Sequence, residues 1–177
     1  MKRVFLFVVV VALSVSFVSA QSKVTKETVA GITNLARVET TVACAGAITP
    51  GSVAEIKKMG FVSIVNLREA SEQGANVEAE AAAAKAAGLK YVHIPFVTAS
   101  PSTAAVDNFL KAMAESGTQP AFIHCAGGNR AAAMWFVKRM VTDKWDEARA
   151  MDEAGQLGFA SQPLKTFMLD YAKTHSK

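Results

Sequence analysis

The stretch that decides the fold is Ala121-Phe122-Ile123-His124-Cys125-Ala126-Gly127-Gly128-Asn129-Arg130. Residues 121–124 form a short apolar run that is typical of a buried strand, and the apolar segment 130–141 predicts a helix. The two adjacent glycines between them predict a tight loop. A strand that leads through a short loop into a helix is the unit of a sheet covered by helices, so this stretch predicts an α/β fold.

The same alternation continues on both sides of this stretch. Residues 21–34 have no apolar pattern, and we expect a loose N-terminal segment there. No internal repeat or linker divides the rest, which predicts one α/β domain over residues 35–177, with a mostly parallel central sheet covered by helices on both faces. The further predicted strands are 61–65 and 91–94, and the predicted helices are 49–60, 76–87, 103–116, 145–156 and 162–173.

Composition excludes several classes of function. The 177 residues include 19 Lys and Arg against 15 Asp and Glu, without a basic run, so we expect no nucleic-acid partner. Two cysteines are too few for a disulfide scaffold or for a zinc site with four cysteine ligands. No group of His, Asp and Glu has metal-ligand spacing, and we expect neither a metal nor a cofactor.

The first 20 residues are typical of a secretory signal. Lys2 and Arg3 precede the apolar run of residues 4–13, and Val18-Ser19-Ala20 has the small residues of a cleavage site. A membrane-spanning helix needs about 20 apolar residues, which this run does not reach. We therefore predict a signal peptide over 1–20, no stable membrane anchor after its cleavage, and a periplasmic or secreted mature protein.

The loop after the strand 121–124 carries residues with catalytic chemistry. Ligands of open parallel sheets bind beyond the carboxyl ends of the strands, where the next helix begins. Backbone N–H groups of such a loop and helix start can surround an oxyanion, and they favour the thiolate of a cysteine beside them. The planar guanidinium of Arg130 can bind two oxygens of that oxyanion. The predicted nucleophile is Cys125, and the predicted oxyanion-binding residues are Ala126, Gly127, Gly128, Asn129 and Ala131.

These residues resemble the compact bacterial dual-specificity-like cysteine phosphatases, in a branch with four residues between Cys and Arg. The segments 60–69 and 88–95 are similar to two further segments of that group. The resemblance implies that Cys125 attacks phosphorus and becomes a phosphocysteine, while Arg130 clamps the phosphate. It also implies that the partner is a phosphorylated substrate or another oxyanion. With the predicted signal peptide, this would be an exported phosphate ester or phosphoprotein. His124 either orients the loop through its ring N–H or is a hydrogen-bonded core histidine.

The sequence departs from the usual pattern of these phosphatases at two further positions. Ala131 stands where a Ser or Thr usually follows the Arg, and the segment 96–102, where an Asp acid is usual, has no carboxylate. Glu69 and Glu72 follow the strand 61–65 and are the candidate replacement acids. We expect weak hydrolysis, or hydrolysis selective for good leaving groups, because a general acid contributes about 10²- to 10⁴-fold in rate.

Two other classes of function stay open. Rhodanese-like sulfurtransferases resemble this chain in their loop of four residues between Cys and Arg, and in an Arg-Glu pair like Arg68-Glu69. Such an enzyme would carry a persulfide on Cys125. A non-catalytic oxyanion-binding module is favoured by Ala131 and by the missing acid.

Two expectations concern the chemistry around the loop. In the resembling phosphatases, the segment that precedes the helix predicted at 49–60 lies beside the catalytic loop, which implies that Cys44 is a redox partner of Cys125. An oxidised thiolate would then be captured as a reversible disulfide. We also expect Arg130→Lys to lose most anion affinity with little effect on stability, because Arg130 should face the ligand.

Overall fold

A six-stranded sheet lies at the centre of the computed structural model, which describes residues 23–175. Its strand order is β1-β2-β3-β6-β4-β5, in which β3, β6, β4 and β5 are parallel and β1, β2 and β3 are antiparallel. The strands are β1 (Val24–Val29), β2 (Ile32–Val38), β3 (Val42–Ala45), β4 (Ser63–Asn66), β5 (Lys90–His93) and β6 (Ala121–His124).

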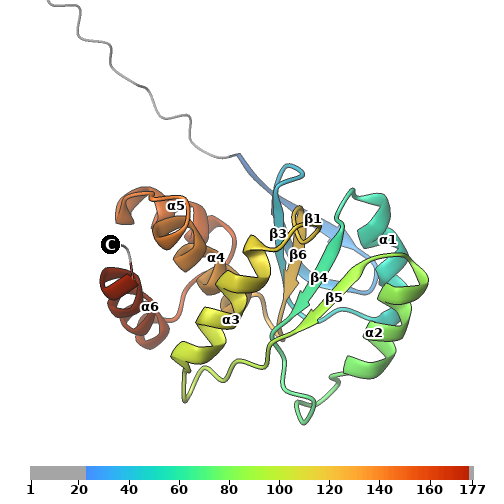
Figure 1. The fold of residues 1–177 in the computed structure, drawn as a ribbon. Coiled ribbons are helices and arrows are strands. Elements are labelled where there is room, and N and C mark those ends of the chain that lie inside the picture. The colour runs from blue at the N-terminus through green and yellow to red at the C-terminus, as the bar shows by residue number, and fades with distance from the viewer. Residues whose placement is uncertain (1–22, 176–177) are drawn as a thin grey trace, which may run out of the picture.

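Helices cover both faces of this sheet. Figure 1 shows α1 and α2 on one face and α3, α4, α5 and α6 on the other. This arrangement confirms the predicted α/β fold with a mostly parallel sheet. The helical elements are η1 (Pro50–Ser52), α1 (Val53–Lys58), α2 (Val77–Ala86), α3 (Thr103–Ala114), α4 (Asn129–Val141), α5 (Glu147–Gln156) and α6 (Gln162–His175).

The helix α4 is the most deeply buried element of the helical layer. Every side chain from Ala131 to Val137 is fully buried, and α5 and α6 pack against the helix. Burial on all sides fixes a helix in place, since its shift would open cavities in a close-packed core. The N-terminus of α4 therefore holds the loop before it in a fixed position.

The prediction of a loose segment over residues 21–34 was wrong. Residues 24–29 form β1, and β2 begins at Ile32, so the ordered domain begins well before residue 35. The central residues of β1 are Thr25, Lys26, Glu27 and Thr28, which do not give the apolar alternation of a half-buried strand. An edge strand with one exposed face needs little apolar content, because its neighbour supplies the backbone hydrogen bonds.

Within residues 23–175, no helix is long and apolar enough to cross a membrane. The predicted signal peptide over 1–20 lies outside the described residues.

Candidate active site

The loop between β6 and α4 brings a backbone amide onto the thiol of Cys125. The N–H of Gly128 donates to Cys125 Sγ at 3.1 Å, and Cys125 is 2% exposed. Gly128 has a φ of 101°, which residues with a side chain rarely adopt. Gly127 has no such φ, so only one of the two glycines is required by the backbone. The loop therefore points a backbone N–H at the sulfur that the sequence suggested as the nucleophile.

The first turn of α4 supplies further donors at the same place. Asn129, Arg130 and Ala131 open the helix, and the N–H groups at a helix start have no acceptor within the helix. These donors and the positive end of the helix dipole favour an anion beside Cys125. The structure thus brings the predicted loop residues together in one turn.

The strand β3 anchors the loop from its other side. The N–H of Cys125 donates to Ala45 O at 3.1 Å, and the N–H of Ala47 donates to Ala126 O at 2.9 Å. A Cβ at Gly46 would lie 2.8 Å from Ala126 O, so only glycine permits this close approach. Sequence reasoning missed Gly46, because the need for it arises only once β3 and the loop are adjacent.

Arg130 uses part of its guanidinium to hold the protein together. Its Nη1 donates to Leu67 O at 3.2 Å and to Phe96 O at 2.8 Å, and the side chain is largely buried. Nη1 and Nη2 also donate to the two carboxylate oxygens of Glu72, at 2.6 and 2.8 Å. Arg130 therefore does not face a ligand alone, and we now expect Arg130→Lys to lower stability, because Arg130 joins the segments that follow β4 and β5.

The guanidinium of Arg130 also interacts with the side chain of Cys125. Arg130 Nε bonds no oxygen of the described residues. Burial by itself would lower the pKa of Arg130, but the hydrogen bond to Glu72 and the nearby Cys125 raise that pKa above its usual value. The guanidinium is therefore charged, and Cys125 lies close enough to affect it. An oxyanion beside Cys125 would meet both Arg130 and the thiol.

Glu72 is the counterion of Arg130 rather than a proton donor. The hydrogen bond from Arg130, helped by those from Glu69 N–H and Arg68, lowers the pKa of Glu72 to about 2. Arg68 Nε lies 3.3 Å from Glu72 Oε2, and Arg68 is itself buried. The carboxylate is thus ionised at neutral pH, which argues against Glu72 as the replacement acid. We call Arg130, Glu72 and Arg68 the arginine network.

Glu69 makes no comparable contacts. Its backbone N–H donates to Glu72 Oε1 at 3.0 Å, but among residues 23–175 its carboxylate forms no hydrogen bond or ion pair. The side chain is partly exposed beside the arginine network. Of the two carboxyl groups that the sequence suggested as acids, only that of Glu69 is free to take this role.

His124 faces away from the loop that it precedes. It is fully buried, and its Nε2 lies 3.3 Å from Glu80 Oε2 on α2. Neither ring nitrogen has a hydrogen-bond partner among the described residues, and neither does Glu80 Oε1. The structure therefore shows neither the loop contact nor the hydrogen-bonded core histidine that we expected.

Two further polar side chains surround the carboxylate of Glu80. Asn66 Nδ2 donates to Glu80 Oε2 at 2.8 Å, and the Tyr91 hydroxyl donates to the same oxygen at 3.1 Å. Burial and the carboxylate of Glu80 raise the pKa of Tyr91, so the phenol remains a donor. We call Glu80, His124, Tyr91 and Asn66 the Glu80 network. Sequence reasoning missed this network, because Glu80 lies in an alanine-rich helix whose sequence does not mark a buried face.

Cys44 is a fully buried residue of β3, opposite Ile123 of β6. Burial, with the nearby Cys125 and Glu153, raises the pKa of the Cys44 thiol well above its usual value. Both cysteines belong to the same apolar cluster, and both are free thiols. The disulfide between them stays a prediction, which mass spectrometry of mildly oxidised protein would test.

Asn129 has a role beyond its backbone. Its Oδ1 accepts from the N–H groups of Ala160 and Ser161 at 2.8 and 3.1 Å, which fastens the start of α4 to the segment before α6. Within residues 23–175, no group of three His, Cys, Asp or Glu side chains is placed to hold a metal ion.

Comparison with known proteins places this geometry in a family. Residues 34–142 match the family model described as beta-lactamase hydrolase-like protein, phosphatase-like domain. Beta-lactamase hydrolase-like proteins from two strains of Xylella fastidiosa are 33% identical over 102 residues, which cover 55% of this chain and 23% of theirs. The chain thus spans about a quarter of the length of the relatives it matches.

Several solved structures share the fold. A candidate phosphatase from Shewanella putrefaciens has a TM-score of 0.69 at 20% identity, covering 83% of this chain and 96% of that one. TpbA of P. aeruginosa, in complex with phosphotyrosine, has a TM-score of 0.64 at 18% identity, covering 91% and 98%. These likenesses concern the fold, whereas the family model covers more than half of the chain. The chain belongs to the phosphatase-like domain family of the beta-lactamase hydrolase-like proteins, which confirms the predicted likeness to cysteine phosphatases.

Proposed function

We propose, on the premise of this family membership, that the protein is a cysteine-dependent phosphatase that acts through a phosphocysteine intermediate on a phosphate ester or phosphoprotein. The observation that carries the proposal is the placement of Cys125 Sγ beside the Gly128 N–H, the first turn of α4 and the Arg130 guanidinium. Nucleophile, amide donors and guanidinium at one point are what phosphoryl transfer requires. The phosphotyrosine bound by TpbA supports a phosphorylated substrate.

The proposed reaction has two steps. The thiolate of Cys125 attacks phosphorus, so that an S–P bond forms and the ester P–O bond breaks, and the leaving oxygen takes its proton from an acid or from water. Water then attacks the phosphocysteine, the S–P bond breaks, and inorganic phosphate leaves as the thiolate is restored. The guanidinium of Arg130 and the loop amides stabilise the charge on the phosphoryl oxygens in both steps.

The leaving group decides how fast the first step runs. Glu72 is ionised and bound to Arg130, and the segment 96–102 contains no carboxylate. Without an oriented acid, the leaving oxygen departs as an anion, which is easy for a nitrophenolate and hard for an alkoxide. We therefore propose selectivity for aryl esters or other good leaving groups.

The test is turnover of p-nitrophenyl phosphate by the purified protein and by Cys125→Ser. We expect slow hydrolysis by the wild type and none by the variant, with Cys44→Ala as a control that removes the other thiol. A phosphoenzyme trapped by rapid acid quench should carry its label on Cys125. Equal rates for wild type and Cys125→Ser would refute the proposal.

A sulfurtransferase is the second candidate, and the loop of four residues between Cys125 and Arg130 is the observation that favours it. The same protein would be assayed with thiosulfate and cyanide. Thiocyanate formation without phosphate release would replace the phosphatase by this enzyme. Binding of inorganic phosphate, with neither phosphate ester hydrolysis nor thiocyanate formation, would instead identify a non-catalytic oxyanion-binding module.

We also propose that the protein is exported and acts in the periplasm or outside the cell. Support comes from the basic start, the short apolar run and the small residues before Gln21. Cell fractionation and N-terminal sequencing of the mature protein test this. We expect a chain that begins at Gln21 in the exported fraction, and an uncleaved chain in the cytosol would contradict it.

A further inference from the structure

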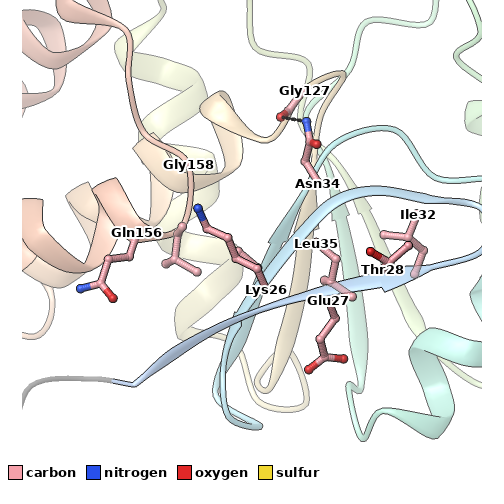
Figure 2. A pocket seen from close by; sticks show the side chains of 11 residues that line it. Lys26, Glu27, Thr28, Ile32, Asn34, Leu35, Gly127, Gln156 and Gly158 are labelled. Atoms are coloured by element: carbon pink, nitrogen blue, oxygen red, sulfur yellow. Dashed lines mark hydrogen bonds between the residues drawn. The ribbon is translucent and has the colours of Figure 1, made fainter.

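A cavity of about 580 Å³ adjoins the catalytic loop and has no part in the mechanism above. Figure 2 shows it between the β1–β2 hairpin, Gly127 of the loop and the residues Gln156 and Gly158 at the end of α5. Its volume falls in the range of about 300 to 1,000 Å³ that is usual for small-molecule sites. We call it the hairpin cavity.

The hairpin cavity is joined to the active site through the loop itself. Asn34 on β2 donates from Nδ2 to Gly127 O at 3.1 Å, as drawn in Figure 2. On the other side, Asn129 holds the N–H groups of the segment after α5. Gly127 lines the cavity, whereas Cys125, two residues before it in the loop, does not. An ester whose phosphate is held by the loop would therefore have its alcohol portion beside this cavity.

The lining of the hairpin cavity offers a ligand the positive charge of Lys26. Lys26 reaches into it from β1, and among residues 23–175 it forms no ion pair with a carboxylate. The neighbouring Glu27 does not neutralise it, because Arg37 Nε holds the Glu27 carboxylate at 2.6 Å. An anionic group in the cavity would therefore meet an unpaired cation.

The other lining groups fit the body of an organic ligand. Asn34 and Gln156 offer neutral hydrogen-bonding groups, and Ala36 and Leu157 are buried apolar residues. A few placed polar groups over an apolar floor are typical of a site that orients a small molecule. The chemistry matches an apolar linker that ends in an anion.

We propose that the hairpin cavity binds the alcohol portion of the substrate, and that the substrate is a small phosphate monoester with a second anionic group, a carboxylate or another phosphate. This inference rests on the proposed phosphatase function. Lys26 is then a specificity-determining residue that contacts the second anion, while Cys125 and Arg130 act on the phosphate.

The experiment compares phenyl phosphate with phenyl phosphates that carry a carboxyalkyl chain of increasing length in the para position. The variants are Lys26→Met and a matched control, Lys23→Met, which changes an exposed lysine just before β1 outside the cavity lining. In the wild type we expect one chain length to give the highest kcat/KM. Lys26→Met should lower kcat/KM for that substrate by about three- to tenfold, through KM, as expected for one partly solvated charge contact.

Phenyl phosphate and the control variant separate this inference from the proposed function. Lys26→Met should leave phenyl phosphate turnover unchanged, and Lys23→Met should change neither substrate. Turnover of all substrates with no effect of the carboxylate, or equal losses on both substrates, would overturn the inference and leave the phosphatase in place.

A binding measurement decides the inference even if no substrate turns over. Calorimetry would compare phenylphosphonate with the carboxyalkyl phenylphosphonate of each chain length. We expect tighter binding of a carboxylated probe, lost in Lys26→Met, retained in Lys23→Met and weakened by salt. Equal affinity of both probes for the wild type and the Lys26→Met variant would refute the second-anion site.

Discussion

The arginine network contains Arg130, at the end of the catalytic loop, and the Glu80 network contains His124, which precedes the loop; the two differ in how completely they are paired. In the arginine network, Glu72 bonds two guanidinium groups and a backbone N–H, and Arg130 also bonds two carbonyl groups. In the Glu80 network, one carboxylate oxygen and both nitrogens of His124 lack hydrogen-bond partners among the described residues. The first network is partly exposed at Glu72, whereas the second is fully buried at Glu80 and His124.

Because of this difference, we expect the two networks to contribute differently, one to ligand binding and catalysis and the other to stability. A network whose charges are paired without a ligand is already arranged for binding, so little reorganisation is needed when an oxyanion arrives. Buried polar atoms without partners instead lower stability. Removing one member of such a group leaves its neighbours buried without a hydrogen-bond partner, which costs their full desolvation free energy. The arginine network should therefore govern rate, and the Glu80 network should govern stability.

The largest effect should come from Arg130→Lys. A lysine cannot hold Glu72, two carbonyl groups and an oxyanion at once, since its ammonium is a point donor on a flexible stem. We expect kcat/KM for p-nitrophenyl phosphate to fall roughly 10²- to 10³-fold, as for loss of a transition-state donor. Thermal unfolding should also shift to lower temperature. Arg37→Lys in the hairpin is the control, and retention of full activity by Arg130→Lys would contradict the role of the guanidinium.

The next effect is on stability and comes from Glu80→Ala. Removing the carboxylate leaves Asn66 and Tyr91 without their shared acceptor, and it leaves the buried His124 ring without the carboxylate that lies 3.3 Å away. We expect a loss of about 3 kcal/mol in the free energy of unfolding, measured with urea. Tyr91→Phe removes one donor and should cost about 1 kcal/mol. An unchanged or raised stability of Glu80→Ala would show that the buried carboxylate does not stabilise the fold. It would contradict the assignment of stability to the Glu80 network.

A smaller effect concerns Glu72 and acid. Its pKa is lowered from 4.5 to about 2 in the folded protein, so its stabilising contribution is present above pH 4.5 and is lost as pH falls toward 2. At pH 7, Glu72→Gln should lower the free energy of unfolding by about 1 to 2 kcal/mol, allowing for the partial exposure of the group. The difference from wild type should shrink by pH 3. Glu55→Gln, in an exposed ion pair with Lys58, is the control. A difference that does not change with pH would mean that the charge of Glu72 is not what stabilises the fold.

The smallest effect should come from Glu69→Gln. Nothing among the described residues orients its carboxyl group, so we expect less than about a threefold change in kcat for aryl and alkyl phosphates alike. A loss near 10²-fold that is confined to alkyl phosphates would contradict this expectation and identify Glu69 as the general acid. That result would add a proton donor at the edge of the arginine network.

The sequence by itself determined the elements that depend on neighbouring residues. The strand 121–124 was predicted with its observed bounds, and α4 begins within one residue of the prediction. Cys125 and Arg130 lie close together as the sequence predicted, because a strand, a short loop and a helix start span them in six positions, while their catalytic roles stay a prediction. Apolar runs, helix formers and glycines act locally, and for this reason they can be interpreted without the rest of the chain.

Only the tertiary structure decided what Arg130, His124 and Lys26 contact. Glu72 meets Arg130 across 58 positions of sequence, and Glu80 of α2 reaches His124 at the end of β6. The hairpin that carries Lys26 and Asn34 lacks an apolar alternation, and its place in the fold is set by the pairing of β2 with β3. These contacts join residues far apart in the chain, so their energies depend on the positions of whole elements, which no local pattern encodes.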